Sequence, residues 1–193
     1  MLWNIGSLPL RSATTPLCLQ AATLRQVPVI FALVQENREY LRTWLPWVDA
    51  NQKPADTYHF LKSARNSTLS ADRKDIFEIR YENQLVGLID LHDYNPSQQS
   101  VDIGYWLAEA WQGRGIVSDA CTLLIGYAFK KDKNLEKVFI RCALGNLKSR
   151  HVPERLGFEY IGFDTEKHII NGREHTMAVY CMERKNWKKN DTR

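Results

Sequence analysis

The chain has 193 residues, a formal net charge of +4 at pH 7, 44% hydrophobic residues and 25% charged residues. This length and composition suit one domain of an ordinary globular protein, and the mild positive charge favours an anionic ligand but is too small to indicate direct nucleic-acid binding. No apolar run reaches the length of a membrane span, and the N-terminal residues lack the charged-then-apolar form of a signal peptide. We therefore expect a cytoplasmic protein without membrane attachment.

The first part of the chain predicts one strand followed by two helical segments. Residues 1–15 have no clear period and predict an irregular arm or an edge strand, and residues 16–21 predict the first strand. Thr23 is suited to cap the helix that follows. A second helix is expected near residues 37–47, where Pro46 would end it.

The next elements are one more helix and then strands. Residues 56–65 predict the helix, and the polar residues 66–74 predict a loop. Strands over 76–81 and 84–92 predict a hairpin that turns across the two residues between them. A further strand is expected over residues 99–107.

The second half alternates helices and strands. A helix is expected over 118–129, a strand over 136–143, and a short helix over 146–156 that Gly157 would end.

The last two strands are expected over residues 158–166 and 175–182, and they should pair with each other. Asn171-Gly172 between them is the strongest short hairpin signal in the chain. With no internal repeat and no long linker, the whole order predicts a single α/β domain with a mixed sheet.

The four cysteines form no CxxC or Cys/His pattern with metal-ligand spacing. They are Cys18, Cys121, Cys142 and Cys181. Because most of them fall in apolar helix or strand segments, we expect buried, reduced thiols and no metal.

The segment between the strand over 99–107 and the helix over 118–129 carries the clearest functional signal. Its residues are Gln112, Gly113, Arg114, Gly115, Ile116 and Val117. A glycine-bearing turn between a strand and a helix leaves backbone N–H groups free at the positive end of the helix dipole, and this arrangement binds phosphate. An ordinary tight turn is the alternative.

This loop and its surroundings resemble the GNAT acetyltransferase superfamily. Q-G-R-G-I-V matches the acyl-CoA loop pattern Q/R-x-x-G-x-G/A, except that Val117 stands where the pattern has Gly or Ala. YWLAEAWQGRG, the N-x-x-S-R of residues 146–150, the P-E-R-L-G-F of residues 153–158 and the segment 36–47 are similar to the ribosomal-protein (RimJ/RimL-like) branch. The resemblance runs from about residue 17 to 182.

The resemblance implies a fold, a donor and a reaction. The fold is one GNAT domain over residues 1–193, with a core at about 17–182 and a basic C-terminal tail. Its mostly antiparallel central sheet has splayed fourth and fifth strands and is flanked by helices. The donor is acetyl-CoA, and the reaction is direct transfer of acetyl to an amine through a tetrahedral intermediate.

The resemblance also implies donor-binding residues outside the loop. Free backbone groups at the ends of the splayed strands would bind the pantetheine arm, at Leu107 and Ala108 on one strand and at Cys142 and Ala143 on the other. Asn146 matches the family's pantetheine-binding asparagine, although it is equally suited to cap the following helix.

The residue that protonates the leaving thiolate departs from the wider family. Many GNAT enzymes have a tyrosine seven residues after the asparagine, and here that position is Pro153. Ser149 lies one helical turn before Pro153, and the ribosomal-protein branch typically has serine there. Ser149 is therefore our candidate thiolate partner, and simple support of the helix is its alternative role.

The candidate base for the amine is His168. It occupies the position where the ribosomal-protein branch commonly has a glutamate before x-x-Asn-Gly, and imidazole is well suited to accept a proton near neutral pH. An exposed loop histidine is the alternative, and Glu166 and Glu78 are the next candidates.

Aromatic and basic residues supply further candidates. An aromatic set near the expected acceptor groove would suit a peptide or an amine, although such residues also fill cores. Its members are Trp44, Trp47, Tyr105, Trp106 and Trp111. Three basic residues could meet coenzyme phosphates, namely Arg114, Lys148 and Arg150.

The sequence leaves three functions open. We prefer acetyl transfer to the N-terminal α-amine of a protein, such as a ribosomal protein, because an α-amine is more often neutral than a lysine at pH 7. A polyamine or an aminoglycoside-like amine is the second acceptor class, and a catalytically silent CoA-binding module is the third reading. A homodimer is left open.

Overall fold

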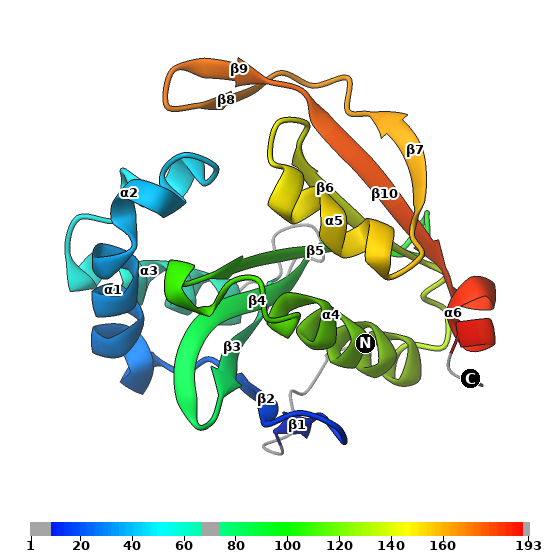
Figure 1. The fold of residues 1–193 in the computed structure, drawn as a ribbon, viewed down its shortest axis with the longest axis horizontal. Coiled ribbons are helices and arrows are strands. Elements are labelled where there is room, and N and C mark those ends of the chain that lie inside the picture. Colours follow the sequence, from blue (N-terminus) through cyan, green and yellow to red (C-terminus); the bar gives the residue numbers. More distant parts are fainter. Residues whose placement is uncertain (1–8, 67–73, 191–193) are drawn as a thin grey trace.

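The computed structural model describes residues 9–66 and 74–190, so most of the loop expected over 66–74 lies outside the described residues (Figure 1). Ten strands are described, eight of which form one sheet in the order β1-β2-β3-β4-β5-β6-β10-β7. These eight strands are β1 (Leu10–Arg11), β2 (Leu17–Ala21), β3 (Asp75–Tyr81), β4 (Gln84–Asn95), β5 (Ser100–Leu107), β6 (Lys137–Ala143), β10 (Met177–Glu183) and β7 (Glu159–Phe163). The expected mixed α/β fold is confirmed.

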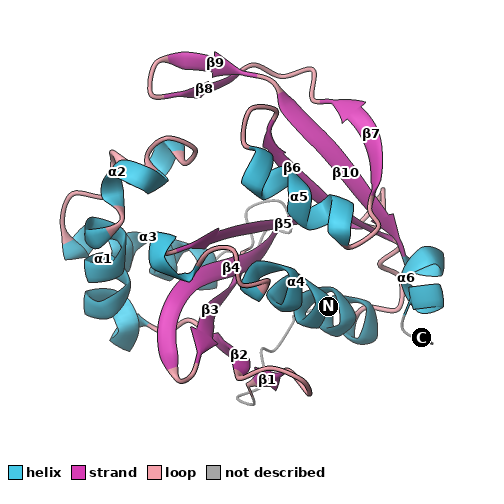
Figure 2. Ribbon diagram, in the orientation of Figure 1, coloured by secondary structure: helices cyan, strands magenta, loops and turns pink. Residues whose placement is uncertain are grey.

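Helices cover both faces of this sheet (Figure 2). The helices of the described residues are α1 (Val27–Glu36), α2 (Arg38–Leu41), α3 (Pro54–Asn66), α4 (Ile116–Lys131), α5 (Leu147–Arg155) and α6 (Arg184–Asn190). Apolar residues of α4 form one core with the sheet, and apolar residues of α1 and α3 form a second core on the opposite face. Among the described residues, no helix is both long and apolar enough to span a membrane.

The central feature of the sheet is the separation of β5 from β6. These two strands are the parallel pair in a sheet that is otherwise antiparallel, and their pairing covers Ser100–Asp102 against Lys137–Phe139. Beyond Asp102, β5 continues beside β4, whereas β6 continues beside β10. Strands β5 and β6 therefore correspond to the splayed fourth and fifth strands that the resemblance implies, and the gap between them opens toward α5 (Figure 1).

The two tight turns predicted from the sequence are present. Glu82 and Asn83 join β3 to β4 with φ of 51° and 65°. Asn171 and Gly172, with φ of 50° and 72°, join β8 (His168–Ile170) to β9 (Arg173–His175). Two successive residues with positive φ match the twist of the flanking strands, which explains why the Asn-Gly signal predicted this hairpin correctly.

The last predicted strands are shorter than expected. Strand β7 pairs with β10 as predicted, but it ends at Phe163 rather than at residue 166. The chain then forms the separate β8–β9 hairpin before it returns to the main sheet, so two strand pairs occupy the region where the sequence predicted one.

Two predicted helix boundaries were wrong. Thr23 lies at the N-cap of a short 3-10 turn, Leu24–Gln26, and its side chain makes no capping hydrogen bond within the described residues; α1 begins only at Val27. Pro46 does not end a helix but begins the 3-10 turn Pro46–Val48. Proline is favoured at a first helical position because its missing N–H has no partner to lose there.

Candidate active site

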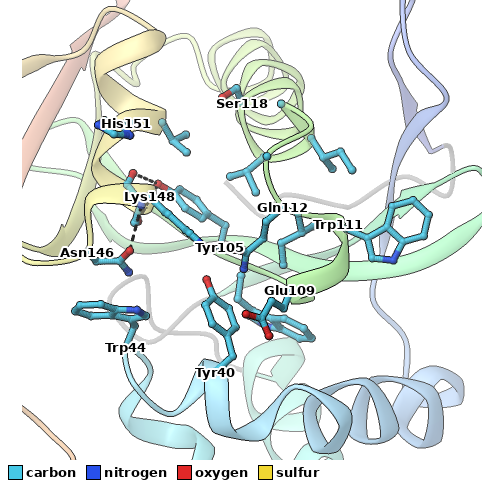
Figure 3. Close-up of a pocket in the computed structure, with 18 of the residues that line it drawn as sticks. Tyr40, Trp44, Tyr105, Glu109, Trp111, Gln112, Ser118, Asn146, Lys148 and His151 are labelled. Carbon is cyan, nitrogen blue, oxygen red and sulfur yellow. Dashed lines mark hydrogen bonds between the residues drawn. The ribbon is translucent and has the colours of Figure 1, made fainter.

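A cavity of about 530 Å³ lies where β5, α4 and α5 converge (Figure 3). It extends to α2 and the residues just after it, together called the α2 segment (residues 38–45). It is lined by Tyr40, Leu41, Trp44, Leu45, Tyr105, Trp106, Leu107, Glu109, Trp111, Gln112, Gly113, Gly115, Ile116, Val117, Ser118, Asn146, Lys148, Ser149, His151, Val152 and Arg155. Most of the predicted donor-binding residues are thus brought together. Ala108, Arg114, Cys142 and Ala143 are not among the lining residues.

The glycine-bearing loop forms the N-terminal start of α4 at this cavity. Gly113 and Gly115 have φ of 73° and 76°, and Gly115 is the N-cap residue of α4. Open space surrounds both glycines, so the backbone conformation rather than crowding requires them. The first hydrogen bond inside α4 runs from the Asp119 N–H to the Gly115 carbonyl. The preceding N–H groups are therefore available to an anion, as the sequence predicted.

Side chains of the loop take separate directions. Gln112 accepts a hydrogen bond from Lys148 Nζ at 3.0 Å through its Oε1, which links the loop to α5. Arg114 instead turns back, because it donates to the Ala110 carbonyl at 3.1 Å and its guanidinium lies 4.8 Å from the centre of the Trp111 ring. Lys148 is thus the basic side chain of the predicted three that lines the cavity, whereas Arg150 donates to Tyr180 Oη at 3.1 Å.

Asn146 occupies the position of a helix cap and also lines the cavity. Its Oδ1 accepts from the Ser149 N–H at 3.2 Å, so it satisfies one of the free donors at the start of α5. The capping role that the sequence offered as an alternative is therefore present, and the same residue remains accessible from the cavity.

Ser149 and Tyr105 form a pair of hydroxyl groups inside the cavity. Ser149 Oγ donates to Tyr105 Oη at 3.3 Å, and Tyr105 Oη donates to the Ser149 carbonyl at 3.0 Å. Burial is the main cause that raises the pKa of Tyr105 well above its usual value, so its phenol stays protonated. The sequence placed Tyr105 only in the aromatic set, because nothing in the spacing of residues 105 and 149 shows that β5 and α5 meet here.

Cys142 lies near the same hydroxyl pair at the end of β6. Burial raises the pKa of its thiol to about 11, and a hydrogen bond with Ser149 acts in the opposite direction. The thiol is therefore protonated at neutral pH, as expected for a buried cysteine.

Four of the five predicted aromatic residues line the cavity. They are Trp44, Tyr105, Trp106 and Trp111. Trp47 lies behind this wall, where its ring packs 6.3 Å from that of Trp106. The aromatic set is thus both a wall of the cavity and part of the packing beneath it.

The three candidate bases from the sequence lie elsewhere. His168 is not among the residues that line the cavity, and its Nε2 lies 3.3 Å from Asp164 Oδ2. Glu166, two residues before His168, is exposed to solvent. Glu78 is fully buried on β3, where it pairs with Arg80 at 2.8 Å and burial raises the pKa of its carboxyl.

The β8–β9 hairpin reaches across to the α2 segment. The Asn171 side chain at its tip donates to the Arg42 carbonyl, and His175 makes an edge-to-face contact with Trp44 at 6.0 Å. Trp44 also lines the cavity, so these contacts place the hairpin at the edge of the cavity. The residues that meet here are more than a hundred positions apart in the sequence. Figure 1 shows the hairpin extending toward α2 above the splayed strands.

Polar side chains gather on the face of β4 and β5 that lies opposite α4. Within the described residues, the donor atoms of His92, Asp93 and Asp102 lie within 4.8 Å of one another, a spacing that a metal ion could use. The guanidinium of Arg141, however, contacts the Asp102 carboxylate directly. A cation already occupies one of the three groups, so this arrangement does not favour a metal.

Comparison with known proteins identifies the family. A family model described as an acetyltransferase (GNAT) domain matches residues 17–159. YdaF of Bacillus subtilis (strain 168), named provisionally as a ribosomal N-acetyltransferase, is 33% identical over 81% of this chain and 85% of its own length. The ribosomal-protein-serine acetyltransferase of Escherichia coli (strain K12) is 28% identical over 84% of this chain and 90% of its own.

A solved structure supports the fold. The ribosomal L7/L12 α-N-protein acetyltransferase RimL, in complex with coenzyme A, superposes with a TM-score of 0.83 at 24% identity, over 93% of this chain and 99% of that one. Spermidine N(1)-acetyltransferases are more distant relatives, and that of Vibrio cholerae is 26% identical over 79% of this chain and 85% of its own.

Proposed function

The chain belongs to the GNAT acetyltransferase family, and on that premise we propose that it transfers acetyl from acetyl-CoA to the N-terminal α-amine of a protein. A ribosomal protein is the acceptor class that the relatives' names favour. The proposal keeps the cytoplasmic location expected from the sequence.

One observation carries the donor half of this proposal. The start of α4, Asn146 and Ser149 line a single cavity, although the loop and α5 are separated by strand β6. Free N–H groups at the start of α4 fit a pyrophosphate, and the gap between β5 and β6 exposes backbone groups that fit the amide-rich pantetheine arm. Acetyl-CoA would supply a thioester whose carbonyl the amine attacks.

Ser149 is suited to donate a hydrogen bond to the sulfur that leaves. Its hydroxyl lies in the cavity, and when Ser149 Oγ turns from Tyr105 Oη toward sulfur, the Tyr105 phenol keeps its own hydrogen bond to the Ser149 carbonyl. Because Cys142 keeps its proton at neutral pH, it does not add a competing negative charge beside that sulfur. These two hydroxyl groups take the place of the family tyrosine, whose position here is Pro153.

The acceptor half rests on an energetic argument and on the relatives. With a pKa of ~7.8, an α-amine is about 14% neutral at pH 7, whereas a lysine with a pKa of ~10.4 is about 0.04% neutral. Deprotonation thus costs about 3.5 kcal/mol more for lysine, at ~1.36 kcal/mol per pKa unit. The contacts of the β8–β9 hairpin with Trp44 and Arg42 also narrow the access to the cavity, and narrow access suits the extended end of a polypeptide better than a folded surface.

Release of free thiol from acetyl-CoA in the presence of different amines tests the proposal. The panel contains peptides with free N-termini, the same peptides with blocked N-termini, and spermidine and spermine. We expect release with the free peptides and background release with the blocked ones. Release with the polyamines alone would show a small-amine acetyltransferase, and CoA binding without release for any amine would show a silent module.

A further inference from the structure

Two side chains on β4 form a dyad that the donor chemistry does not use. His92 Nδ1 and Asp90 Oδ1 lie 2.7 Å apart. An ionised carboxylate can only accept hydrogen bonds, so Nδ1 carries the proton of this contact. In the neutral ring the lone pair is then on Nε2, and Asp90 holds the imidazole in the tautomer that can accept a proton there.

The surroundings of Nε2 suit a positively charged amine. Asp93 Oδ2 lies 3.9 Å from Nε2, and Asp102 of β5 belongs to the same cluster of donor atoms. The charge of Asp102 is partly offset by Arg141 of β6, so Asp90 and Asp93 provide the net negative charge. About a quarter of the His92 side chain is exposed, which leaves it accessible to a ligand.

Gly104 provides the space for the dyad. It lies opposite Asp90 in the pairing of β4 with β5. A Cβ on Gly104 would lie 3.1 Å from His92 Cε1 and 3.2 Å from Asp90 Oδ2, tighter than ordinary van der Waals contact. The absence of a side chain at this position therefore lets the dyad rest directly on the β5 backbone.

The dyad lies beside the gap in the sheet and close to the cavity. Side chains alternate along a strand, so Gly104 and Trp106 face the same side of β5, about 7 Å apart along it. Trp106 lines the cavity, and the pairing of β5 with β6 ends at Asp102, just before Gly104. An amine bound at His92 and Asp90 would therefore reach the gap between β5 and β6 from the face of the sheet opposite α4. Ser149 lies on the other side of the gap, where α5 is.

We propose that His92, oriented by Asp90, is the base that accepts the proton of the acceptor ammonium group. This inference rests on the proposed function. The ammonium gives one proton to His92 Nε2, and its nitrogen lone pair forms the new C–N bond while the C–S bond breaks with its electron pair on sulfur. The second proton lost by nitrogen balances the proton gained by sulfur at the Ser149 side, and His92 returns its proton to solvent.

The pH dependence of kcat/KM for an α-amine peptide tests the proposal, with His92→Gln and Asp90→Asn compared with the wild-type protein. We expect a loss of about 100-fold for His92→Gln at pH 7, the usual scale of general base catalysis, and a smaller loss for Asp90→Asn. Just below the amine pKa of ~7.8 the wild-type rate should change little with pH, because neutral His92 takes the proton of the ammonium form, whereas the His92→Gln rate should rise about tenfold per pH unit because it depends on the neutral amine alone.

Controls separate catalysis from folding and from the proposed function. Acetyl-CoA affinity should be unchanged in both variants, and His59→Gln, an exposed histidine on α3, should match the wild-type protein throughout. If His92→Gln keeps the wild-type rate and pH profile, His92 is not the base, although the acetyltransferase function stands. If the wild-type protein acetylates no amine, the proposed function itself fails. Should His92→Gln not fold, the profile of Asp90→Asn decides, and a wild-type profile there overturns the proposal.

Discussion

The proposed donor side and the proposed acceptor side of this site are built in different ways. The donor side uses the backbone of one short loop, the start of α4 and the cap of α5, so its binding groups are fixed by helix geometry. The proposed acceptor side uses groups from the segment after α2, from β4 and β5, and from the β8–β9 hairpin, and these groups meet only through tertiary contacts. Donor binding should therefore respond to changes in backbone conformation, whereas acceptor selection should respond to individual side chains.

The largest expected effect is the low reactivity of Cys142 at the donor side. A free thiol with a pKa of ~8.5 is about 24% ionised at pH 8, whereas a thiol with a pKa of about 11 is about 0.1% ionised. Alkylation of Cys142 by iodoacetamide should thus be slower by about 200-fold than that of a model thiol, as measured by mass spectrometry. Equal rates would show that this end of β6 is open to solvent.

The sign of the Cys142 effect on stability follows from the same shift. The folded state holds the proton of the Cys142 thiol more tightly than the unfolded state does. Its contribution to the free energy of unfolding is therefore present below pH ~8.5 and is lost as the pH rises toward about 11. Urea unfolding midpoints at pH 7 and pH 10 would detect this loss, and Cys142→Ser should make it smaller.

Removal of the Ser149 hydroxyl should mainly affect turnover. We expect Ser149→Ala to lower kcat by about 100-fold, the usual cost of losing one hydrogen bond to developing charge, with little change in the KM for acetyl-CoA. Ser63→Ala on α3, where the hydroxyl donates to the Phe60 carbonyl, is the matched control. A fall in acetyl-CoA affinity without a fall in kcat would assign Ser149 to binding instead.

A change of backbone conformation in the loop should mainly affect donor binding. Gly115→Val places a β-branched residue at φ of 76°, which costs on the order of 2 kcal/mol, so CoA affinity should fall about 30-fold. Gly126→Ala in the middle of α4 has open space around the new methyl group and should leave CoA affinity unchanged while it stabilises the helix. Titration calorimetry with CoA compares the two.

The smallest expected effect is at the hairpin on the acceptor side. His175→Ala removes the ring contact with Trp44, and such contacts contribute about 1 kcal/mol. The KM for an acceptor peptide should rise about fivefold, and the KM for acetyl-CoA should not change. If both constants change together, the hairpin supports the whole cavity and the two sides are not independent.

The difference between the two sides also explains what the sequence could predict. The glycine-bearing loop, Asn146 and the Asn171-Gly172 turn are local signals, since each depends on the conformation of a few adjacent residues. Predictions at Thr23 and Pro46 failed at helix ends, where 3-10 turns compete with the α-helix over a few residues.

Acceptor-side residues were harder to find. The resemblance implies a base at His168, before the Asn171-Gly172 turn, but in the structure His168 lies beside Asp164 and does not line the cavity. The signal for the dyad was an Asp-x-His pattern on β4, which places Asp90 and His92 on one face, with Gly104 on the neighbouring strand. The sequence could not show that this face is the one beside the gap, because that depends on where β5 and β6 separate.

The site of acetylation on a peptide with a free N-terminus and one internal lysine tests the central claim most directly. Because the α-amine is neutral far more often than lysine, tandem mass spectrometry should locate the acetyl group on the α-nitrogen, and blocking the N-terminus should abolish the reaction. Acetylation of the lysine at a comparable rate, or acetylation of spermidine with neither peptide modified, would contradict the account.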